Sequence, residues 1–245
     1  MIEDNNNKGL ILYVDTPGGS VYASDDLYMK ILDYKNATGR PVYSSMQSQA
    51  ASGGYYISAP CDKIIANRNC WTGSIGVTMG TFVDISGLLS DLGIETETIT
   101  SGANKAMGSA TDPMTDEQRA IFQALIDEAY EQFVQIVAEG RGMSVEQVKA
   151  LADGRIYSAQ QAVDNGLIDA VGTFEEAIND MAAEYDLYDV QVEHFEPEVR
   201  TDLSSILGIL ADQKDSSALT DAEAIEALIA LNGSFRLSYI SSVSK

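Results

Sequence analysis

Apolar and polar positions along the first part of the chain follow a strand–helix–strand order. Residues 10–14 form a short apolar run that is followed by Asp-Thr-Pro-Gly-Gly, which predicts a buried strand ending in a turn. Residues 21–36 carry aliphatic side chains on one face and predict a helix, and residues 40–46 predict the next strand. Because parallel strands need a crossover connection, this order predicts an α/β fold with a parallel sheet.

The same kind of pattern continues toward the C-terminus. We expect a small-residue helix at 51–59, a strand at 63–67, a glycine-punctuated turn or strand at 72–77, a short helix at 88–92 and a strand at 95–100. A long amphipathic helix is predicted at 115–141, and further helices at 144–152, 158–165, 173–185, 203–210 and 221–231. The motifs that could carry chemistry all fall between residues 15 and 110.

Composition and charge exclude several classes of function. The chain has 245 residues, which suits one large domain or a domain with a small appendage. A formal net charge of −22 argues against nucleic acid and against anionic membrane surfaces. No apolar run is long enough to span a bilayer, and the polar N-terminus lacks the apolar core of a signal peptide. Cys61 and Cys70 fit two buried thiols better than a disulfide.

A serine among small residues is the most informative feature of the sequence. Residues 49–56 read Gln-Ala-Ala-Ser-Gly-Gly-Tyr-Tyr, so Ser52 lies at a predicted strand-to-helix turn with two glycines behind it. Such a turn presents a hydroxyl group beside backbone N–H groups, as a serine nucleophile requires. The chain has one histidine, which lies far downstream at His194. A serine hydrolase built on this chain would therefore use a lysine as its base.

The loop at residues 16–21, Thr-Pro-Gly-Gly-Ser-Val, is a second candidate element. It follows a strand and opens a helix, and its glycines let the backbone approach a ligand closely. A phosphate loop would end in Gly-Lys-Ser/Thr, which is absent, so an oxyanion is the better ligand. With the N–H of Gly53, the residue after the nucleophile, Gly19 completes an acyl-transfer site. Taken alone, each motif is equally typical of a purely structural turn.

Lys105 is the candidate base. It could accept a proton only if it is desolvated, because burial can lower a lysine pKa by up to about 3–5 units. From its spacing alone, a surface lysine is the more ordinary interpretation. The aromatic pair Tyr55 and Tyr56 is expected to pack in the core rather than to contact a substrate.

Four motifs together resemble one family. Residues 15–21, 50–57, 72–77 and 101–105 are similar, in order and spacing, to signal peptide peptidase A and its Ser-Lys peptidase family. Residues 153–162 and 166–169 also resemble that family's downstream segment, so the likeness runs from about residue 8 to about residue 176. Four motifs in register favour a functional Lys105 over a surface lysine.

The resemblance implies a role for each matching residue. Ser52 matches the nucleophile and Lys105 matches the general base. Ser74 matches the serine that orients the lysine amine through a hydrogen bond. Gly19 and the N–H of Gly53 match the oxyanion hole. No metal and no cofactor is implied.

The resemblance also implies a fold and an assembly. The expected fold is α/β, a Clp-protease/crotonase-like spiral of strand-strand-helix units with a parallel sheet core and a helical C-terminal extension. Residues 1–185 would form the peptidase core, truncated at the N-terminus because the family's first strand-helix segment and membrane anchor are missing, and residues 186–245 an extension for assembly or the substrate groove. The family works at the bacterial membrane and faces outward, and this chain itself would be soluble. Small members form rings in which the lysine can serve a neighbour's serine.

Three hypotheses remain at this stage. The leading one is an ATP-independent serine endopeptidase that cleaves remnant signal peptides and other short or unfolded polypeptides through an acyl-enzyme. The second is a crotonase-type acyl-CoA enzyme, which shares the fold and the oxyanion hole but has no use for Ser52 or Lys105. The third is a non-catalytic scaffold or peptide-binding subunit, which the missing N-terminal segment favours and the intact dyad disfavours.

Overall fold

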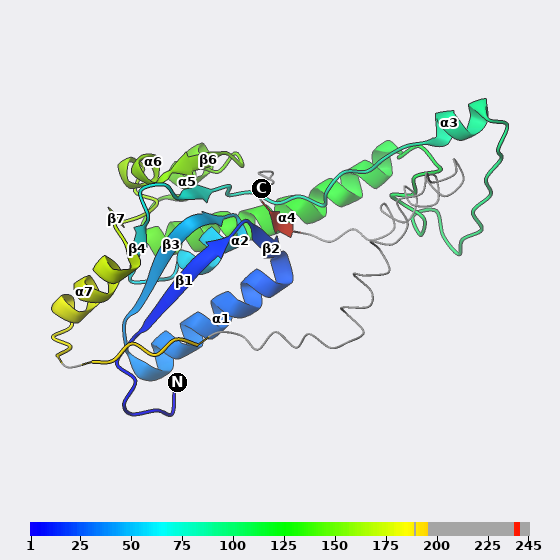
Figure 1. The fold of residues 1–245 in the computed structure, drawn as a ribbon. Helices are drawn as coiled ribbons and strands as arrows, with labels where there is room; N and C mark the ends of the chain where they lie inside the picture. The colour runs from blue at the N-terminus through cyan, green and yellow to red at the C-terminus, as the bar shows by residue number, and fades with distance from the viewer. Residues whose placement is uncertain (189, 196–237, 241–245) are drawn as a thin grey trace, which may run out of the picture. The chain divides into compact units, whose positions relative to one another are not determined.

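A computed structural model describes residues 1–188, 190–195 and, as backbone only, 238–240. These residues divide into two compact units. The first unit comprises Met1–Gly80, Asp116–Tyr188 and the strand at 238–240, and the second comprises Thr81–Thr115 together with 190–195. The first unit contains the sheet and most of the helices (Figure 1).

The first unit is built on a sheet centred on one long strand. Its strands are β1 (Leu10–Thr16), β3 (Val42–Ala51), β4 (Lys63–Ala66), β5 (Trp71–Gly73), β6 (Ile156–Ser158) and β7 (Ala170–Val171). β1 pairs along one edge of β3, while β4 and then β5 pair with successive segments of its other edge. Every pair in this sheet is parallel except β5–β6. The predicted parallel sheet is therefore confirmed, with one antiparallel pair at the β6 edge.

Side chains that alternate along β3 pack into two different hydrophobic cores, one on each face of the sheet. Val42 and Met46 pack with α1 (Val21–Thr38), α2 (Gly53–Ser58) and α4 (Asp116–Arg141) in the main core, whereas Tyr43 faces α7 (Phe174–Glu184). Successive side chains of a strand point to opposite faces, so a sheet covered on both faces needs apolar residues at nearly every position. This explains why the early strands appear in the sequence as continuous apolar runs.

Capping side chains fix where several helices begin. Ser144 and Gln147 form a capping box at the start of α5 (Val145–Leu151), and Ser158 and Gln161 form another at α6 (Ala159–Asp164). Thr173 and Glu176 do the same for α7, which is also held to the sheet because Lys63 pairs with Asp180 and Glu184. These predicted helices are confirmed to within two residues at each end.

The second unit is small. It contains α3 (Ser86–Asp91), whose Leu89 packs with Ile85 and Ala110. The strand predicted at residues 95–100 is wrong, because the structure has no secondary structure there and Ile99 is 90% exposed. Alternating polar and apolar residues become a strand only when a neighbouring strand accepts their hydrogen bonds, and the described part of this unit offers none. The helices predicted at 203–210 and 221–231 lie outside the described residues.

Two short strands form a separate pair in the first unit. β2 (Gly18–Ser20) pairs antiparallel with β8 (Ser238–Ile240), and Gly19 lies opposite Tyr239. β2 directly precedes α1, so the pair lies at the N-terminal end of that helix. Strands of two or three residues such as β2, β6 and β7 carry no readable periodicity, and the sequence analysis missed them.

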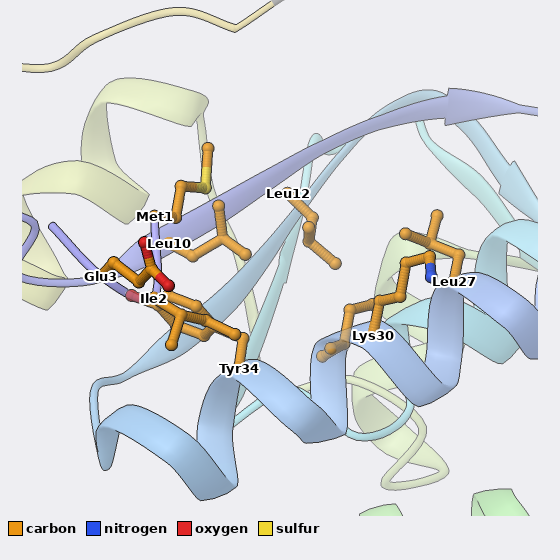
Figure 2. A pocket seen from close by; sticks show the side chains of 9 residues that line it. Met1, Ile2, Glu3, Leu10, Leu12, Leu27, Lys30 and Tyr34 are labelled. Atoms are coloured by element: carbon orange, nitrogen blue, oxygen red, sulfur yellow. The ribbon is translucent and has the colours of Figure 1, made fainter.

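An open groove of about 590 Å³ lies beside β1 and α1. Figure 2 shows Leu10 and Leu12 of β1 and Leu27 of α1 with the N-terminal residues Met1 and Ile2 around it. None of the residues predicted for chemistry lines this groove. Among the described residues, no helix is both long and apolar enough to cross a membrane.

Both cysteines are buried, unpaired thiols, as expected. Burial raises the pKa of the Cys61 thiol and of the Cys70 thiol to about 12 each, because the thiolate would lose its hydration. The neutral thiol is thus favoured in the folded state, and its stabilising contribution is present below the ordinary thiol pKa of about 8.5 and is lost as pH rises toward 12.

We therefore expect neither thiol to react with a chromogenic disulfide reagent at pH 8 while the protein is folded. Two equivalents should react after unfolding in guanidinium chloride. Reaction of either thiol in the folded protein, at a rate near that of the unfolded chain, would contradict the burial described here.

Candidate active site

The turn between β3 and α2 gives Ser52 an unusual backbone conformation. Its φ is 54° and its ψ is −113°, a backbone conformation that residues other than glycine seldom adopt. The Ser52 N–H donates a hydrogen bond to the Gly73 carbonyl oxygen at 2.8 Å, which holds the turn in place. The residue is 0% exposed, and its Oγ has no hydrogen-bond partner among the described residues. Backbone strain and an unsatisfied buried hydroxyl group thus meet in one residue.

The two glycines after Ser52 allow α2 to pack directly on the β1–β2 turn. A methyl group at Gly53 would lie 3.1 Å from the Gly19 nitrogen and 3.4 Å from Gly18 Cα. A methyl group at Gly54 would lie 2.8 Å from Thr16 Cγ2. The backbone of Gly53 therefore lies against that of Gly19, and the N–H of Gly53 belongs to the first helical turn, where no intrahelical acceptor exists.

Local hydrogen bonds shape the loop that carries Gly19. The Gly18 N–H donates to Thr16 Oγ1 at 3.2 Å, and Gly18 has a φ of 121°, which only glycine adopts without strain. Ser20 then caps α1, because its Oγ accepts from the Ala23 N–H at 3.2 Å. Gly19 is thereby fixed between a closed turn and a capped helix.

Ser74 lies beside the turn that carries Ser52. It directly follows Gly73, the residue whose carbonyl oxygen holds Ser52, and it also has a positive φ, 50°. The Ser74 N–H donates to the Arg155 carbonyl oxygen at 2.8 Å, and the residue is only 6% exposed. Nothing in the sequence predicts this role of Gly73 beyond its place directly before Ser74 in a glycine-punctuated segment.

Lys105 belongs to the second unit. Its N–H donates to the Gly102 carbonyl oxygen at 3.0 Å in a turn, and its side chain is exposed. The first unit therefore brings Ser52, Gly53, Gly19 and Ser74 together, whereas Lys105 is carried by a separate part of the chain.

Two buried tyrosines hold α2 against the core. Tyr55 and Tyr56 are both 0% exposed, which confirms that they pack in the core. The Tyr55 hydroxyl group donates to the Leu167 carbonyl oxygen at 2.7 Å, and that of Tyr56 donates to Asp25 Oδ1 at 2.7 Å. Burial raises the pKa of Tyr55, so this phenol stays neutral and serves as a hydrogen-bond donor. The described residues contain no cluster of three or more His, Cys, Asp or Glu side chains that could hold a metal ion.

Comparison with known proteins identifies the family. The sequence profile described as peptidase family S49 matches residues 34–188, which include Ser52, Ser74 and Lys105. The chain belongs to peptidase family S49. This agrees with the Ser-Lys peptidase family that its motifs resemble.

Individual relatives match across most of this chain. A candidate signal peptide peptidase SppA of Enterococcus faecium is 41% identical over 206 residues, which are 84% of this chain and 59% of that protein. A candidate protease of Methanocaldococcus jannaschii is 42% identical over 72% of this chain and 56% of its own length. Protease 4 of Haemophilus influenzae is 37% identical over 86% of this chain and 34% of its own length. The chain thus spans about three fifths, or less, of the length of these relatives.

The close contact at Gly53 leads to a test. Gly53→Ala should lower kcat at least about 100-fold, because a methyl group there would lie 2.5 Å from Ser24 Oγ and 3.1 Å from the Gly19 nitrogen and would push α2 away from the β1–β2 turn. The measurement is peptide hydrolysis under saturating substrate, with circular dichroism to verify folding.

Gly87→Ala is the matched control. Gly87 lies in α3, and a methyl group there would meet nothing within 4 Å. This variant should keep wild-type kcat. Normal activity of folded Gly53→Ala would show that the close approach of Gly53 to Gly19 and Ser24 is not needed.

Proposed function

We propose that the chain is the catalytic part of an ATP-independent serine endopeptidase that cleaves remnant signal peptides and other short or unfolded polypeptides. One observation carries the proposal: Ser52 combines a strained backbone with a fully buried hydroxyl group that has no partner among the described residues. Strained conformations cost on the order of 1–3 kcal/mol each and persist where function depends on them. Membership of peptidase family S49 supports the same activity.

The reaction follows from the proposed roles. Ser52 Oγ attacks the carbonyl carbon of the scissile peptide bond while Lys105 Nζ takes the hydroxyl proton, with Ser74 orienting the amine. The N–H groups of Gly19 and Gly53 stabilise the negative oxygen of the tetrahedral intermediate. The intermediate then collapses, the C–N bond breaks, and the leaving amine takes the proton from Lys105. Water, activated by the same lysine, hydrolyses the Ser52 ester and releases the acid.

Assembly of the site is part of the proposal. A lysine acts as a base only as the neutral amine, which requires burial, and the exposed Lys105 of the second unit must therefore be enclosed beside Ser52 before catalysis. We propose that a ring-shaped homo-oligomer provides this enclosure. In such a ring, Lys105 of one chain can serve Ser52 of its neighbour.

Four further properties of the family complete the proposal. The fold would be the Clp-protease/crotonase-like spiral, of which the sheet centred on β3 is the core. Residues 1–185 would form the peptidase core, and residues 186–245 would contribute to assembly or to the substrate groove. The complete protein would work at the bacterial cell membrane and face outward.

The substrate would bind as an added strand on β2. Gly18–Ser20 already pairs antiparallel with β8, so this edge accepts an extended chain of the same polypeptide. Main-chain hydrogen bonds to a sheet edge give affinity without demanding a particular side chain, which suits a protease for unfolded polypeptides. Because Gly19 is in β2, a peptide on this edge passes beside one of the proposed oxyanion donors.

The dyad is tested with Ser52→Ala, Lys105→Ala and Lys105→Arg against an internally quenched unfolded protein, without ATP or metal. Each variant should lose at least about 1,000-fold in kcat, and the arginine variant fails because a guanidinium group stays protonated. Lys30→Ala, which removes an exposed ion pair with Asp26, should keep wild-type activity. An acyl-transfer activity that persists in Ser52→Ala would favour a crotonase-type enzyme instead.

Mixing two inactive variants tells which chain supplies the base. Ser52→Ala and Lys105→Ala chains are denatured together and refolded. If the lysine acts on a neighbouring chain, mixed rings contain some intact pairs and regain part of the activity. If the pair forms within one chain, the mixture stays inactive although the wild type refolds to full activity.

Strand addition at β2 predicts competition with β8. Proline has no N–H, and of two successive residues in a strand only one directs its N–H at a given neighbouring strand. Proline at one of the two positions Ser238 and Tyr239 must therefore remove a hydrogen bond between β8 and β2. One of the two variants should lower KM for an unfolded substrate several-fold at unchanged kcat. Unchanged KM in both would show that β8 and the substrate do not share this edge.

A further inference from the structure

Ser24 is a buried serine that the mechanism above leaves unused. It lies in the first turn of α1, and only 7% of its surface is exposed. Within the described part of the chain, its hydroxyl group makes no hydrogen bond. Ser24 belongs to the same unit as Ser52.

The Ser24 hydroxyl group lies close to Gly53, where Gly53 approaches Gly19. A methyl group at Gly53 would be 2.5 Å from Ser24 Oγ and 3.1 Å from the Gly19 nitrogen. The Ser24 hydroxyl oxygen and the Gly19 nitrogen therefore both lie within about 3 Å of the position that a Cβ atom of residue 53 would occupy. Ser24 thus lies where the start of α2 packs against β2.

A hydroxyl group that has no partner among the described residues can donate its hydrogen to a ligand that binds beside it. The negatively charged oxygen of a tetrahedral intermediate has three lone pairs, and the N–H groups of Gly19 and Gly53 use two of them. A hydroxyl group, whose hydrogen rotates about the Cβ–Oγ bond, can donate to the third.

We propose that Ser24 Oγ–H is a third hydrogen-bond donor to the oxyanion, in addition to the N–H groups of Gly19 and Gly53. The proposal rests on the peptidase function proposed above. Ser24 forms no covalent bond and transfers no proton. It acts because the bond it makes is stronger to the negative oxygen of the intermediate than to the neutral carbonyl oxygen of the substrate.

The test compares Ser24→Ala with wild type in three measurements: kcat and KM on a fluorogenic peptide, inhibition by a peptide boronate, and the midpoint of thermal unfolding. A boronate forms a tetrahedral adduct with a serine nucleophile and places an oxygen in the oxyanion hole. We expect kcat to fall about 10–100-fold, KM to change less than twofold, and boronate affinity to fall by about the same factor as kcat. The thermal midpoint should stay unchanged or rise, because the lost hydroxyl group has no partner in the unliganded protein.

Ser44→Ala is the matched control for a structural serine. Ser44 is 0% exposed and its Oγ lies 2.8 Å from Ser58 Oγ, so removing it breaks a buried hydrogen bond. This variant should unfold at a lower temperature and keep its kcat. Ser24→Cys retains the size of the side chain with a much weaker donor, and it should also lose kcat, which covers the case in which Ser24→Ala fails to fold.

The outcomes separate this proposal from the one on which it rests. An active wild type, an inactive Ser52→Ala and an unimpaired Ser24→Ala would overturn the role of Ser24 alone. A Ser24→Ala variant that loses kcat together with thermal stability, but binds the boronate as the wild type does, would also overturn it and leave a packing role. A wild type that neither cleaves the peptide nor binds the boronate would overturn both proposals.

Discussion

The hydrogen bond from the Ser52 N–H to the Gly73 carbonyl oxygen is the constraint on which the site depends. It holds a serine in backbone geometry that glycine normally occupies, at the turn between β3 and α2. The rest of the first unit makes this bond possible. β5 carries Gly73 and pairs with the last residues of β3, and the buried tyrosines of α2 fix the helix against the core. Weakening any of these supports would let Ser52 relax toward an ordinary turn.

The glycines of the site are needed for two reasons. Gly18 is needed for its positive φ angle, and Gly53 and Gly54 are needed because neighbouring atoms leave no room for a side chain. Gly73 meets both conditions, because its φ is 80° and a methyl group there would lie 2.5 Å from Tyr157 Cδ2. The lack of room at Gly53 brings the Gly19 and Gly53 backbones together and leaves the Ser24 hydroxyl group near Gly53. The proposed nucleophile and the proposed oxyanion donors therefore belong to one compact unit, while the proposed base belongs to the other.

The sequence predicted the elements that carry long periodic patterns and missed those that depend on partners. The early strands and α4 were predictable because buried strands are continuously apolar and long helices repeat their apolar face. β6 and β7 have only three and two residues, so tertiary pairing alone defines them. Residues 95–100 have a strand-like alternation but no strand beside them in the described structure. The strand-to-helix turn at Ser52 was predictable from its glycines, whereas Ser24 resembles any small helix residue until the position of Gly53 is known.

The most direct test of the account is to react the native protein with a fluorophosphonate probe and to map the modified residue by peptide mass spectrometry. A serine hydroxyl group reacts with this probe only when a base activates it and an oxyanion site receives the phosphonyl oxygen. The account predicts one modified residue, Ser52, with labelling abolished by Lys105→Ala. Labelling of another serine, or none in a folded and assembled protein, would contradict the claim that the turn after β3 carries the nucleophile.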